Sequence, residues 1–101
     1  YKQLKAKALI KVKANYLWKT EKIAEHGFHT DTAQHIKDHE ADWKTALYYI
    51  NTNNGYTKFE NGKKVKSKAN RLVIFPASVR HTGSTCTDKD ERIVLNVNYY
   101  D

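Results

Sequence analysis

Hydrophobic and polar residues alternate with a period of two along much of the chain. In the segment 9–14, apolar side chains alternate with Lys11 and Lys13, which is the pattern of a strand with one buried and one solvated face. Other segments are rich in β-branched and aromatic residues and end at turn-forming residues. Strands are predicted at 9–14, 43–50, 56–60, 63–68, 71–75 and 92–100.

Turn signals separate these segments. Asn61-Gly62 is the strongest hairpin signal in the chain. Pro76 ends the apolar segment 71–75. The lysines of 63–68 mark an edge strand, because charged side chains there discourage pairing with other chains. Seven or eight short strands with closely spaced turns predict a sandwich, barrel or jelly roll, in a single all-β domain spanning 1–101.

Helical patterns are weak by comparison. The segment 1–8 is compatible with the tail of a helix, and 33–42 with one or two helical turns. No apolar run approaches the roughly 18 residues that a membrane-spanning helix needs. We therefore expect little helix and no membrane association.

The composition narrows the setting of the protein. Hydrophobic residues make up 40% of the chain, which is enough to fill a core and argues against disorder. The single cysteine, Cys86, cannot form an internal disulfide, so a cytoplasmic location is favoured. The chain begins at Tyr1 and contains no methionine, so we expect a core trimmed from a longer polypeptide.

The charge balance is basic. Lys and Arg number 18 against 11 Asp and Glu, which gives a net charge of +7. Basic domains often bind nucleic acid, but the lysines gather in 1–20 and 58–71 on either side of the acidic segment 31–42. Such stretches on a small domain are more often solvated faces than binding surfaces. A basic β-sandwich that binds nucleic acid or an acidic partner without catalysis stays as an alternative hypothesis.

A His-x-Asp pattern and a distant histidine form a candidate metal site. In an extended segment, residues two apart project from the same face, so His29 and Asp31 would offer an imidazole and a carboxylate to one ion. His81 follows an apolar strand and a proline turn, 52 residues after His29, and a folded sheet can bring the two together. Two histidines and one carboxylate leave coordination positions open, as in non-haem Fe(II) oxygenases.

A candidate anion site follows on the last predicted strand. Arg92 begins that strand, 11 residues after His81. A buried guanidinium needs an anionic partner, and its planar fork binds a carboxylate through two parallel hydrogen bonds. Asn96 lies on the same face of the strand and is a candidate hydrogen-bond donor there.

Other polar and aromatic residues have simpler interpretations. His35 and His39 are four residues apart, which on a helix permits zinc binding, but the stretch lacks clear caps, and a polar loop over the site is favoured. His26 is expected to be exposed or to support the site without binding metal. Adjacent side chains of a strand project from opposite faces, and in the pair Tyr48-Tyr49 we expect Tyr48 to be the core residue.

The set His29-x-Asp31, His81 and Arg92 resembles the 2-oxoglutarate and Fe(II)-dependent dioxygenase superfamily. The resemblance is to the prolyl-4-hydroxylase-like branch, with a looser similarity to phage and bacterial members, and it covers nearly the whole chain. Further segments resemble that branch in the same order: 45–51 (TALYYIN), 54–59 (NGYTKF), 70–76 (NRLVIFP) and 79–83 (VRHTG). Each segment alone is a weak signal, but all of them in order are a specific one.

The resemblance implies a fold, a metal site and a reaction. The implied fold is a double-stranded β-helix, the jelly roll also found in cupins, and the implied iron ligands are His29, Asp31 and His81. The implied activity is hydroxylation of an unactivated C–H bond with O2 as cosubstrate, releasing succinate and CO2, with ascorbate as a candidate reductant. The substrate itself is unknown; a peptidyl proline, in a peptide or protein, is favoured by the branch.

The resemblance also assigns the cosubstrate site. Arg92 is expected to bind the far carboxylate of 2-oxoglutarate, and Tyr49 and Tyr16 match cosubstrate-side tyrosines. Many relatives carry Arg-x-Ser on the last strand where this chain has Val94, and some use Lys in place of Arg. The first glycine of the Gly-Gly turn is Asn54 here. None of these departures touches the expected iron ligands.

A third hypothesis is a cupin-like metal protein that does not use 2-oxoglutarate. Arg92 separates it from the dioxygenase, because such a protein has no need of a buried arginine beside the metal. The sequence leaves the oligomeric state open.

Overall fold

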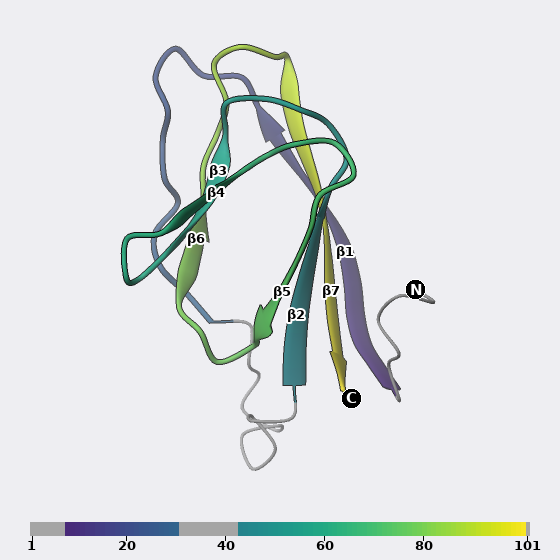
Figure 1. The fold of residues 1–101 in the computed structure, drawn as a ribbon. Coiled ribbons are helices and arrows are strands. Elements are labelled where there is room, and N and C mark those ends of the chain that lie inside the picture. The colour runs from purple at the N-terminus through teal and green to yellow at the C-terminus, as the bar shows by residue number, and fades with distance from the viewer. Residues whose placement is uncertain (1–7, 31–42, 101) are drawn as a thin grey trace.

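The computed structural model describes residues 8–30 and 43–100. These residues form seven β-strands and no helix, arranged as two facing antiparallel sheets (Figure 1). The strands are β1 (Ala8–Trp18), β2 (Trp43–Tyr49), β3 (Tyr56–Phe59), β4 (Lys64–Lys66), β5 (Leu72–Pro76), β6 (His81–Gly83) and β7 (Glu91–Tyr100). The all-β prediction is confirmed.

The larger sheet has the strand order β1-β7-β2-β5, and the smaller has the order β4-β3-β6. Neighbours in the larger sheet are far apart in the chain, and the first strand pairs with the last along nearly its whole length. The segment 19–29 continues the smaller sheet past β6 through isolated bridges, Glu25 with Ser84 and His29 with His81. This order is that of a jelly roll, which faces two sheets across a shared interior.

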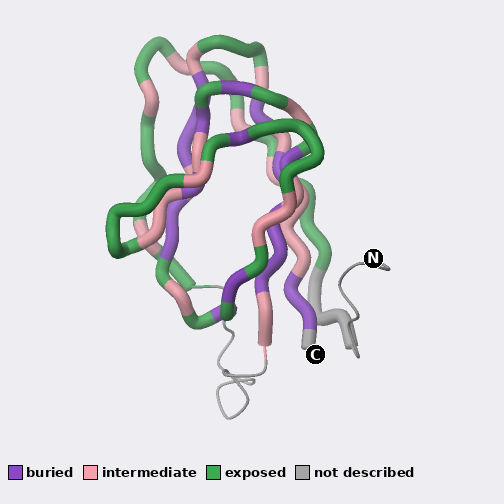
Figure 2. Tube along the Cα trace, in the orientation of Figure 1, coloured by how far each residue is buried: buried purple, intermediate pink, exposed green. Residues whose placement is uncertain are grey.

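The core lies on the inner face of the larger sheet. Alternation along β2 and β7 turns Leu47, Tyr49 and Val94 toward the smaller sheet, where they form one buried cluster with Phe75. Phe59 of β3 packs against this cluster from the opposite sheet. Figure 2 shows the same pattern, with buried segments along the strands and exposed segments in the outer loops.

Most strand predictions are confirmed. Strands form within or around all six predicted segments, and β4 lies at a sheet edge as its lysines indicated. The Asn61-Gly62 turn joins β3 to β4, with Gly62 at a φ of 93°, a backbone conformation that glycine adopts without strain. The first strand is longer than predicted and reaches Trp18. Apart from Ala8, which belongs to β1, the helical expectations at 1–8 and 33–42 lie outside the described residues.

The expectation for the tyrosine pair is wrong. Tyr49 is fully buried in the core, whereas Tyr48 is half-buried on the outer face and its hydroxyl donates to Asn70 Oδ1. The prediction assumed that the strand face carrying the candidate site is exposed to solvent and that the core lies on the other face. The structure places site and core on one face, because both lie between the two sheets.

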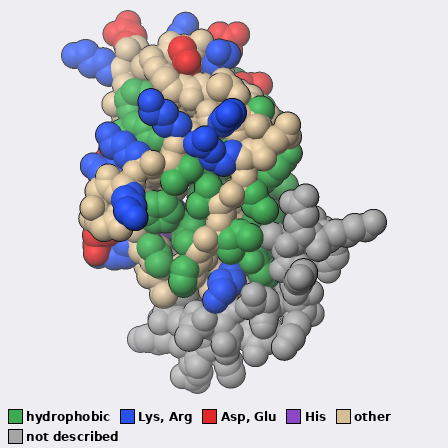
Figure 3. All heavy atoms as spheres, in the orientation of Figure 1, with side chains coloured by type: hydrophobic (Ala, Val, Ile, Leu, Met, Phe, Trp, Pro, Cys, Tyr) green, Lys and Arg blue, Asp and Glu red, His purple; other side chains and the backbone are tan. Residues whose placement is uncertain are grey.

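Charged side chains are spread over the surface. On the face shown in Figure 3, lysine and arginine side chains occur at several separate places among hydrophobic and neutral ones. Two basic residues near β3 form ion pairs. Lys58 pairs with Glu25 at 3.7 Å, and Arg80 pairs with Glu60 at 3.1 Å. Ion pairs this exposed contribute little to stability.

Candidate active site

A cavity of about 730 Å³ lies between the two sheets. Its walls come from β1, from the segment 26–30, and from one residue each of β2 and β3, two of β6 and three of β7. Residues from both ends of the chain therefore meet in one space, as the pairing of β1 with β7 requires. Five of the predicted site residues line it: Tyr16, His29, His81, Arg92 and Asn96.

Two histidines that are 52 residues apart in the sequence lie directly opposite each other. His29 N donates to His81 O and His81 N donates to His29 O, both at 2.9 Å. Side chains of such a directly opposed antiparallel pair project from the same face. The two imidazole centroids are 4.5 Å apart, with the rings tilted by 50°. The smaller sheet thus holds two imidazoles at one point of the cavity wall.

Backbone carbonyls set the orientation of both rings. His81 Nδ1 lies 3.0 Å from Val79 O, and His29 Nδ1 lies 3.4 Å from Gly27 O. A carbonyl oxygen can only accept, so Nδ1 is the donor in these contacts, and a neutral imidazole with its proton on Nδ1 has its lone pair on Nε2. This is the tautomer in which a histidine binds metal through Nε2. His81 is 3% exposed and its ring contacts Phe75 edge-on at 4.8 Å, which fixes its position further.

The third predicted metal ligand, Asp31, lies outside the described residues, as do His35 and His39. Within residues 8–30 and 43–100, no group of three or more His, Cys, Asp or Glu side chains has the arrangement of a metal site. The described part of the chain therefore supplies two nitrogen donors. The chemistry of this pair fits a divalent transition metal such as Fe(II), which imidazole binds well.

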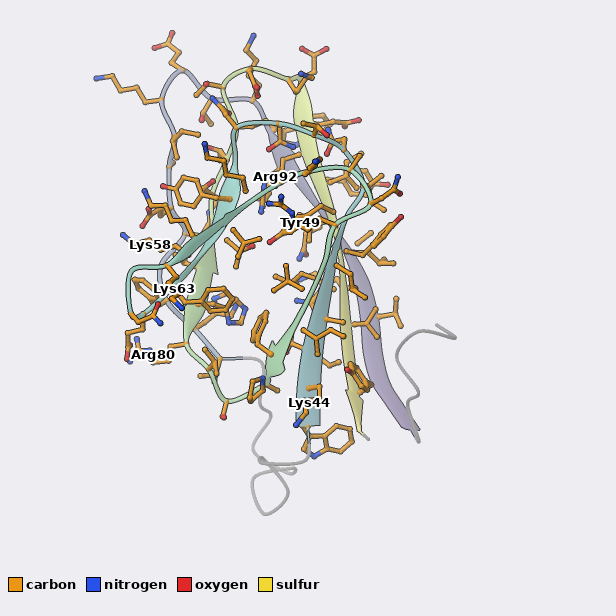
Figure 4. All side chains as sticks on the ribbon, in the orientation of Figure 1. Lys44, Tyr49, Lys58, Lys63, Arg80 and Arg92 are labelled. Carbon is orange, nitrogen blue, oxygen red and sulfur yellow. The ribbon has the colours of Figure 1, made fainter. Side chains whose placement is uncertain are left out.

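Arg92 is a buried cation at the inner end of the cavity. Its side chain is 2% exposed, and burial lowers the pKa of its guanidinium from the usual value. Nε donates to Ser67 Oγ at 2.7 Å and Nη2 to Thr57 Oγ1 at 3.5 Å, while the guanidinium carbon lies 5.8 Å from the centre of the Tyr49 ring. Figure 4 shows Arg92 and Tyr49 close together between the two sheets.

No carboxylate of the described residues forms an ion pair with Arg92. Both of its described hydrogen-bond partners are neutral hydroxyls, and Nη1 faces Gly83, a residue of the cavity wall. A buried charge without a counter-charge is costly for a fold. A carboxylate that enters the cavity would supply the missing negative charge, so the residues present fit an anionic ligand.

Tyr49 and Asn96 take different positions around this cation. The Tyr49 hydroxyl donates to Thr57 Oγ1 at 2.8 Å, and burial raises the pKa of Tyr49. Tyr49 thereby positions the Thr57 hydroxyl, which Arg92 also contacts. Tyr49 itself is not among the residues that line the cavity. Asn96 lies on the wall itself, four residues from Arg92 on the same face, and its Oδ1 accepts from Asn98 Nδ2 at 2.9 Å.

Tyr16 is placed differently from the expectation. It belongs to the cavity wall, but it is 59% exposed and pairs with Ile93, on the opposite face of the sheet from Arg92. Alternation along β1 directs the neighbouring side chain, Leu17, to the Arg92 face instead. The structure therefore does not bring the Tyr16 side chain to the cation.

Two hydroxyl residues around Arg92 were missed by sequence reasoning. Thr57 lies in the segment 54–59, which resembles the family. That resemblance is the sequence signal that could have indicated Thr57 as a site residue. Ser67 carries no such signal, because it follows a weakly patterned edge strand and reaches Arg92 only through the fold. Both are 2% exposed.

Gly55 gives Arg92 the space that it occupies. A Cβ atom at position 55 would lie 2.5 Å from Arg92 Cδ and 2.8 Å from Arg92 Nε. The glycine of this turn is thus needed for close approach, and its φ lies outside the left-handed range. The sequence signal was present, since Gly55 belongs to the turn that resembles the family's Gly-Gly motif.

We expect Gly55→Ala to lower the free energy of unfolding by about 1–3 kcal/mol, because the added methyl group overpacks a buried side chain. Urea-induced unfolding followed by tryptophan fluorescence measures the change. Gly83→Ala is the matched control, since its Cβ would lie 3.6 Å from Arg92 Nη1, an ordinary contact distance. Equal losses for the two variants would contradict the proximity argument.

A profile of the 2OG-Fe(II) oxygenase superfamily matches residues 14–100. The chain belongs to this superfamily. Its members as a group use Fe(II), 2-oxoglutarate and O2, and the histidine pair and the buried arginine both lie within the matched region. The matched region contains every predicted site residue.

Solved structures support the cupin-like jelly-roll fold of this superfamily member. A cupin protein from Bacteroides fragilis matches with a TM-score of 0.63 and 11% sequence identity, over 88% of this chain and 64% of that one. A protein from Neisseria meningitidis matches with a TM-score of 0.57 and 12% identity, over 90% of this chain and 80% of that one. This chain thus spans less than two thirds of the Bacteroides fragilis protein.

No curated protein matches the chain significantly. Within the described residues, no helix is long and apolar enough to cross a membrane.

Proposed function

We propose that the protein is an Fe(II)- and 2-oxoglutarate-dependent dioxygenase that hydroxylates an unactivated C–H bond. One observation carries this proposal: a buried arginine with no described carboxylate partner lines the same cavity as two facing histidines. A metal protein that bound only an ion or a neutral ligand would not need this cation. A dicarboxylate that binds metal at one end accounts for both features.

The residues have distinct roles in this proposal. His29 and His81 bind the metal through Nε2, and Asp31, which follows His29 by two residues, supplies the carboxylate ligand. Arg92 binds the far carboxylate of 2-oxoglutarate, and Asn96 offers a hydrogen bond on the same wall. When bound, iron and 2-oxoglutarate supply the oxidising chemistry, in which O2 is consumed and succinate and CO2 are released.

The neighbouring side chains prepare the site for that ligand. Ser67 and Thr57 hold the Arg92 guanidinium in place, and Tyr49 holds Thr57. Such positioning before binding lowers the conformational entropy that binding costs. The carbonyls of Val79 and Gly27 hold the two imidazoles in the metal-binding tautomer.

The finer assignments rest on the resemblance. The motif order favours the prolyl-4-hydroxylase-like branch, with a peptidyl proline as substrate and ascorbate as the reductant. The cytoplasm, as the proposed setting, rests instead on the single cysteine, Cys86. Within this proposal Tyr16 contributes main-chain groups to the cavity wall instead of a side-chain contact to 2-oxoglutarate.

The decisive experiment is an anaerobic titration with Fe(II), with and without 2-oxoglutarate. We expect a weak visible charge-transfer band only when both are present, because it requires 2-oxoglutarate to bind the metal directly. Asp31→Asn should weaken Fe(II) binding, since an amide is a poorer ligand than a carboxylate for this ion. Absence of the band, together with full Fe(II) affinity in Asp31→Asn, would contradict the proposal.

A cupin-like metal protein that does not use 2-oxoglutarate is the second candidate, favoured by the fold match to a cupin protein. The same titration separates the two. A metal protein of this kind would bind Fe(II) and show no spectral response to 2-oxoglutarate. Succinate, which lacks the 2-oxo group, serves as the control ligand for non-specific binding of a dicarboxylate.

A further inference from the structure

The strand β1 forms one edge of the larger sheet. Among the described residues it pairs only with β7, and it is eleven residues long. An edge strand carries main-chain N–H and C=O groups that can pair with another extended chain. A long edge beside a cavity is therefore a candidate docking site.

The ladder shows which main-chain groups face outward. Lys19 N donates to Asp90 O at 3.0 Å in continuation of the β1–β7 pairing, and the register is regular from Lys11 onward. Main-chain groups of alternate residues point to opposite sides of a strand. Thr20 N accordingly points the other way, to Cys86 O at 2.9 Å. By this alternation the outward-facing groups are those of Ala14, Tyr16 and Trp18.

The cavity runs along this edge. Five consecutive residues, 13–17, line it. Successive side chains project from opposite faces, so a cavity that lay beneath one face would be lined by alternate residues. Lining by consecutive residues means that the cavity reaches the main chain at the edge. The opposite wall is formed by His26, His29 and Thr30, so the space between the two walls lies beside the histidine pair.

In the described part of its lining, this space carries positive charge. Lys13 lines it on the β1 side, opposite Asn96 in the sheet, and forms no ion pair with a described residue. The described lining contains no Asp or Glu. Along β7, Asn96 is four residues from Arg92, about 13 Å at the rise of a strand. Lys13 therefore lies at another level of the cavity than the cation assigned to 2-oxoglutarate.

We propose that the substrate is an extended peptide segment with an acidic residue, which pairs with the outward edge of β1, where the described residues form no sheet pairing. One side chain of the peptide enters the cavity beside the histidine pair, and Lys13 binds the acidic residue. Main-chain pairing supplies affinity in this mode of recognition, and alternate side chains supply specificity. The inference rests on the proposed function, because the side chain in the cavity is the one to be hydroxylated.

The test uses acetylated, amidated nine-residue peptides with a central proline, in which Glu or Lys occupies each flanking position in turn. Binding is measured anaerobically, and main-chain amide exchange of β1 is followed by NMR with and without Fe(II) and 2-oxoglutarate. We expect Glu-containing peptides to bind best and to slow exchange at Ala14 and Tyr16. Methylation of the peptide's own amide nitrogens at alternate positions should abolish this protection.

Ala14→Pro tests the edge directly. It removes an outward-facing N–H and leaves the β7 ladder intact, a position where proline is tolerated in an edge strand. We expect it to weaken peptide binding about tenfold, the effect of one or two lost hydrogen bonds. Ala14→Val, which keeps the N–H, should bind peptide as the unmodified protein does. Lys13→Glu should reverse the preference from Glu to Lys peptides, and Lys19→Glu, outside the cavity, should not.

Several results would overturn the inference. These are equal binding by Ala14→Pro and Ala14→Val, no protection of β1 amides by any peptide, or amides already protected without peptide because another segment or a second copy covers the edge. Fe(II) and 2-oxoglutarate binding is measured in the same samples. If Fe(II) and 2-oxoglutarate still bind while the peptide results fail, only the peptide inference is contradicted. If Fe(II) and 2-oxoglutarate do not bind, the proposed function itself is contradicted.

Discussion

The Arg92→Met variant should lose 2-oxoglutarate binding while its ligand-free form becomes at least as stable as the unmodified protein. The affinity should fall at least about 30-fold, which corresponds to more than about 2 kcal/mol. The reason is that Arg92 and Lys13 are the only Lys or Arg side chains among the described residues that line the cavity, and Arg92 is the buried one. Methionine fills a similar volume and carries no charge.

The stability should move in the opposite direction for an electrostatic reason. Replacing even a buried ion pair by hydrophobic residues of similar volume is often neutral or stabilising by about 1–4 kcal/mol, and Arg92 is buried without a described counter-charge. The lost hydrogen bonds to Ser67 and Thr57 offset part of this gain. Thr57 keeps the Tyr49 hydroxyl as a partner, which limits the loss.

Thermal unfolding of the Fe(II)-loaded protein, with and without 2-oxoglutarate, measures both effects. A ligand at one hundred times its Kd stabilises a folded protein by about 2.7 kcal/mol, and this stabilisation should vanish in Arg92→Met. Arg80→Met is the matched control, because Arg80 is exposed and pairs with Glu60 away from the cavity. Unchanged 2-oxoglutarate stabilisation in Arg92→Met would remove this residue from the cosubstrate site.

The strands could be predicted because their signal is local. Alternation in 9–14 and the Asn61-Gly62 turn depend on neighbouring residues, and these elements formed where the sequence indicated. The strand β6 was not predicted, because three residues are too few to show a period. The prediction that Tyr48, and not Tyr49, lies in the core was wrong because it assumed that the core and the site lie on opposite faces of the strand. The inner face of the sheet holds both.

The site could be predicted only in part. Residue types and order indicated His29, His81 and Arg92 as one group, and the structure brings these three to one cavity. The direct opposition of His29 and His81 is a matter of register between distant segments, which spacing alone does not determine. Ser67 is a further example, since it follows β4 and its contact with Arg92 on β7 joins residues 25 positions apart.

The His29→Ala variant should lose Fe(II) binding more than about 100-fold without destabilising the fold. Residues that only support a metal ligand typically change affinity 10- to 100-fold, and removing a ligand itself should exceed this. His29 is exposed, so its truncation leaves no buried void. Anaerobic titration with Fe(II) measures the affinity, and urea-induced unfolding checks the fold.

His26→Ala provides the matched control. His26 precedes His29 by three residues, is also exposed and lines the same cavity, so the two variants differ in the ring that faces His81. We expect His26→Ala to bind Fe(II) as the unmodified protein does. Equal losses in the two variants would mean that the segment, and not the His29 imidazole, is what the metal requires.

A double variant decides whether the two histidines bind one ion. His81→Asn alone should lose Fe(II) affinity as His29→Ala does, because one imidazole and one carboxylate hold the ion poorly. If both rings bind the same ion, His29→Ala combined with His81→Asn should lose much less than the sum of the two single effects, since either change already disrupts the site. Independent sites would give additive losses. Strong non-additivity, at a centroid distance of 4.5 Å, is what one shared metal predicts.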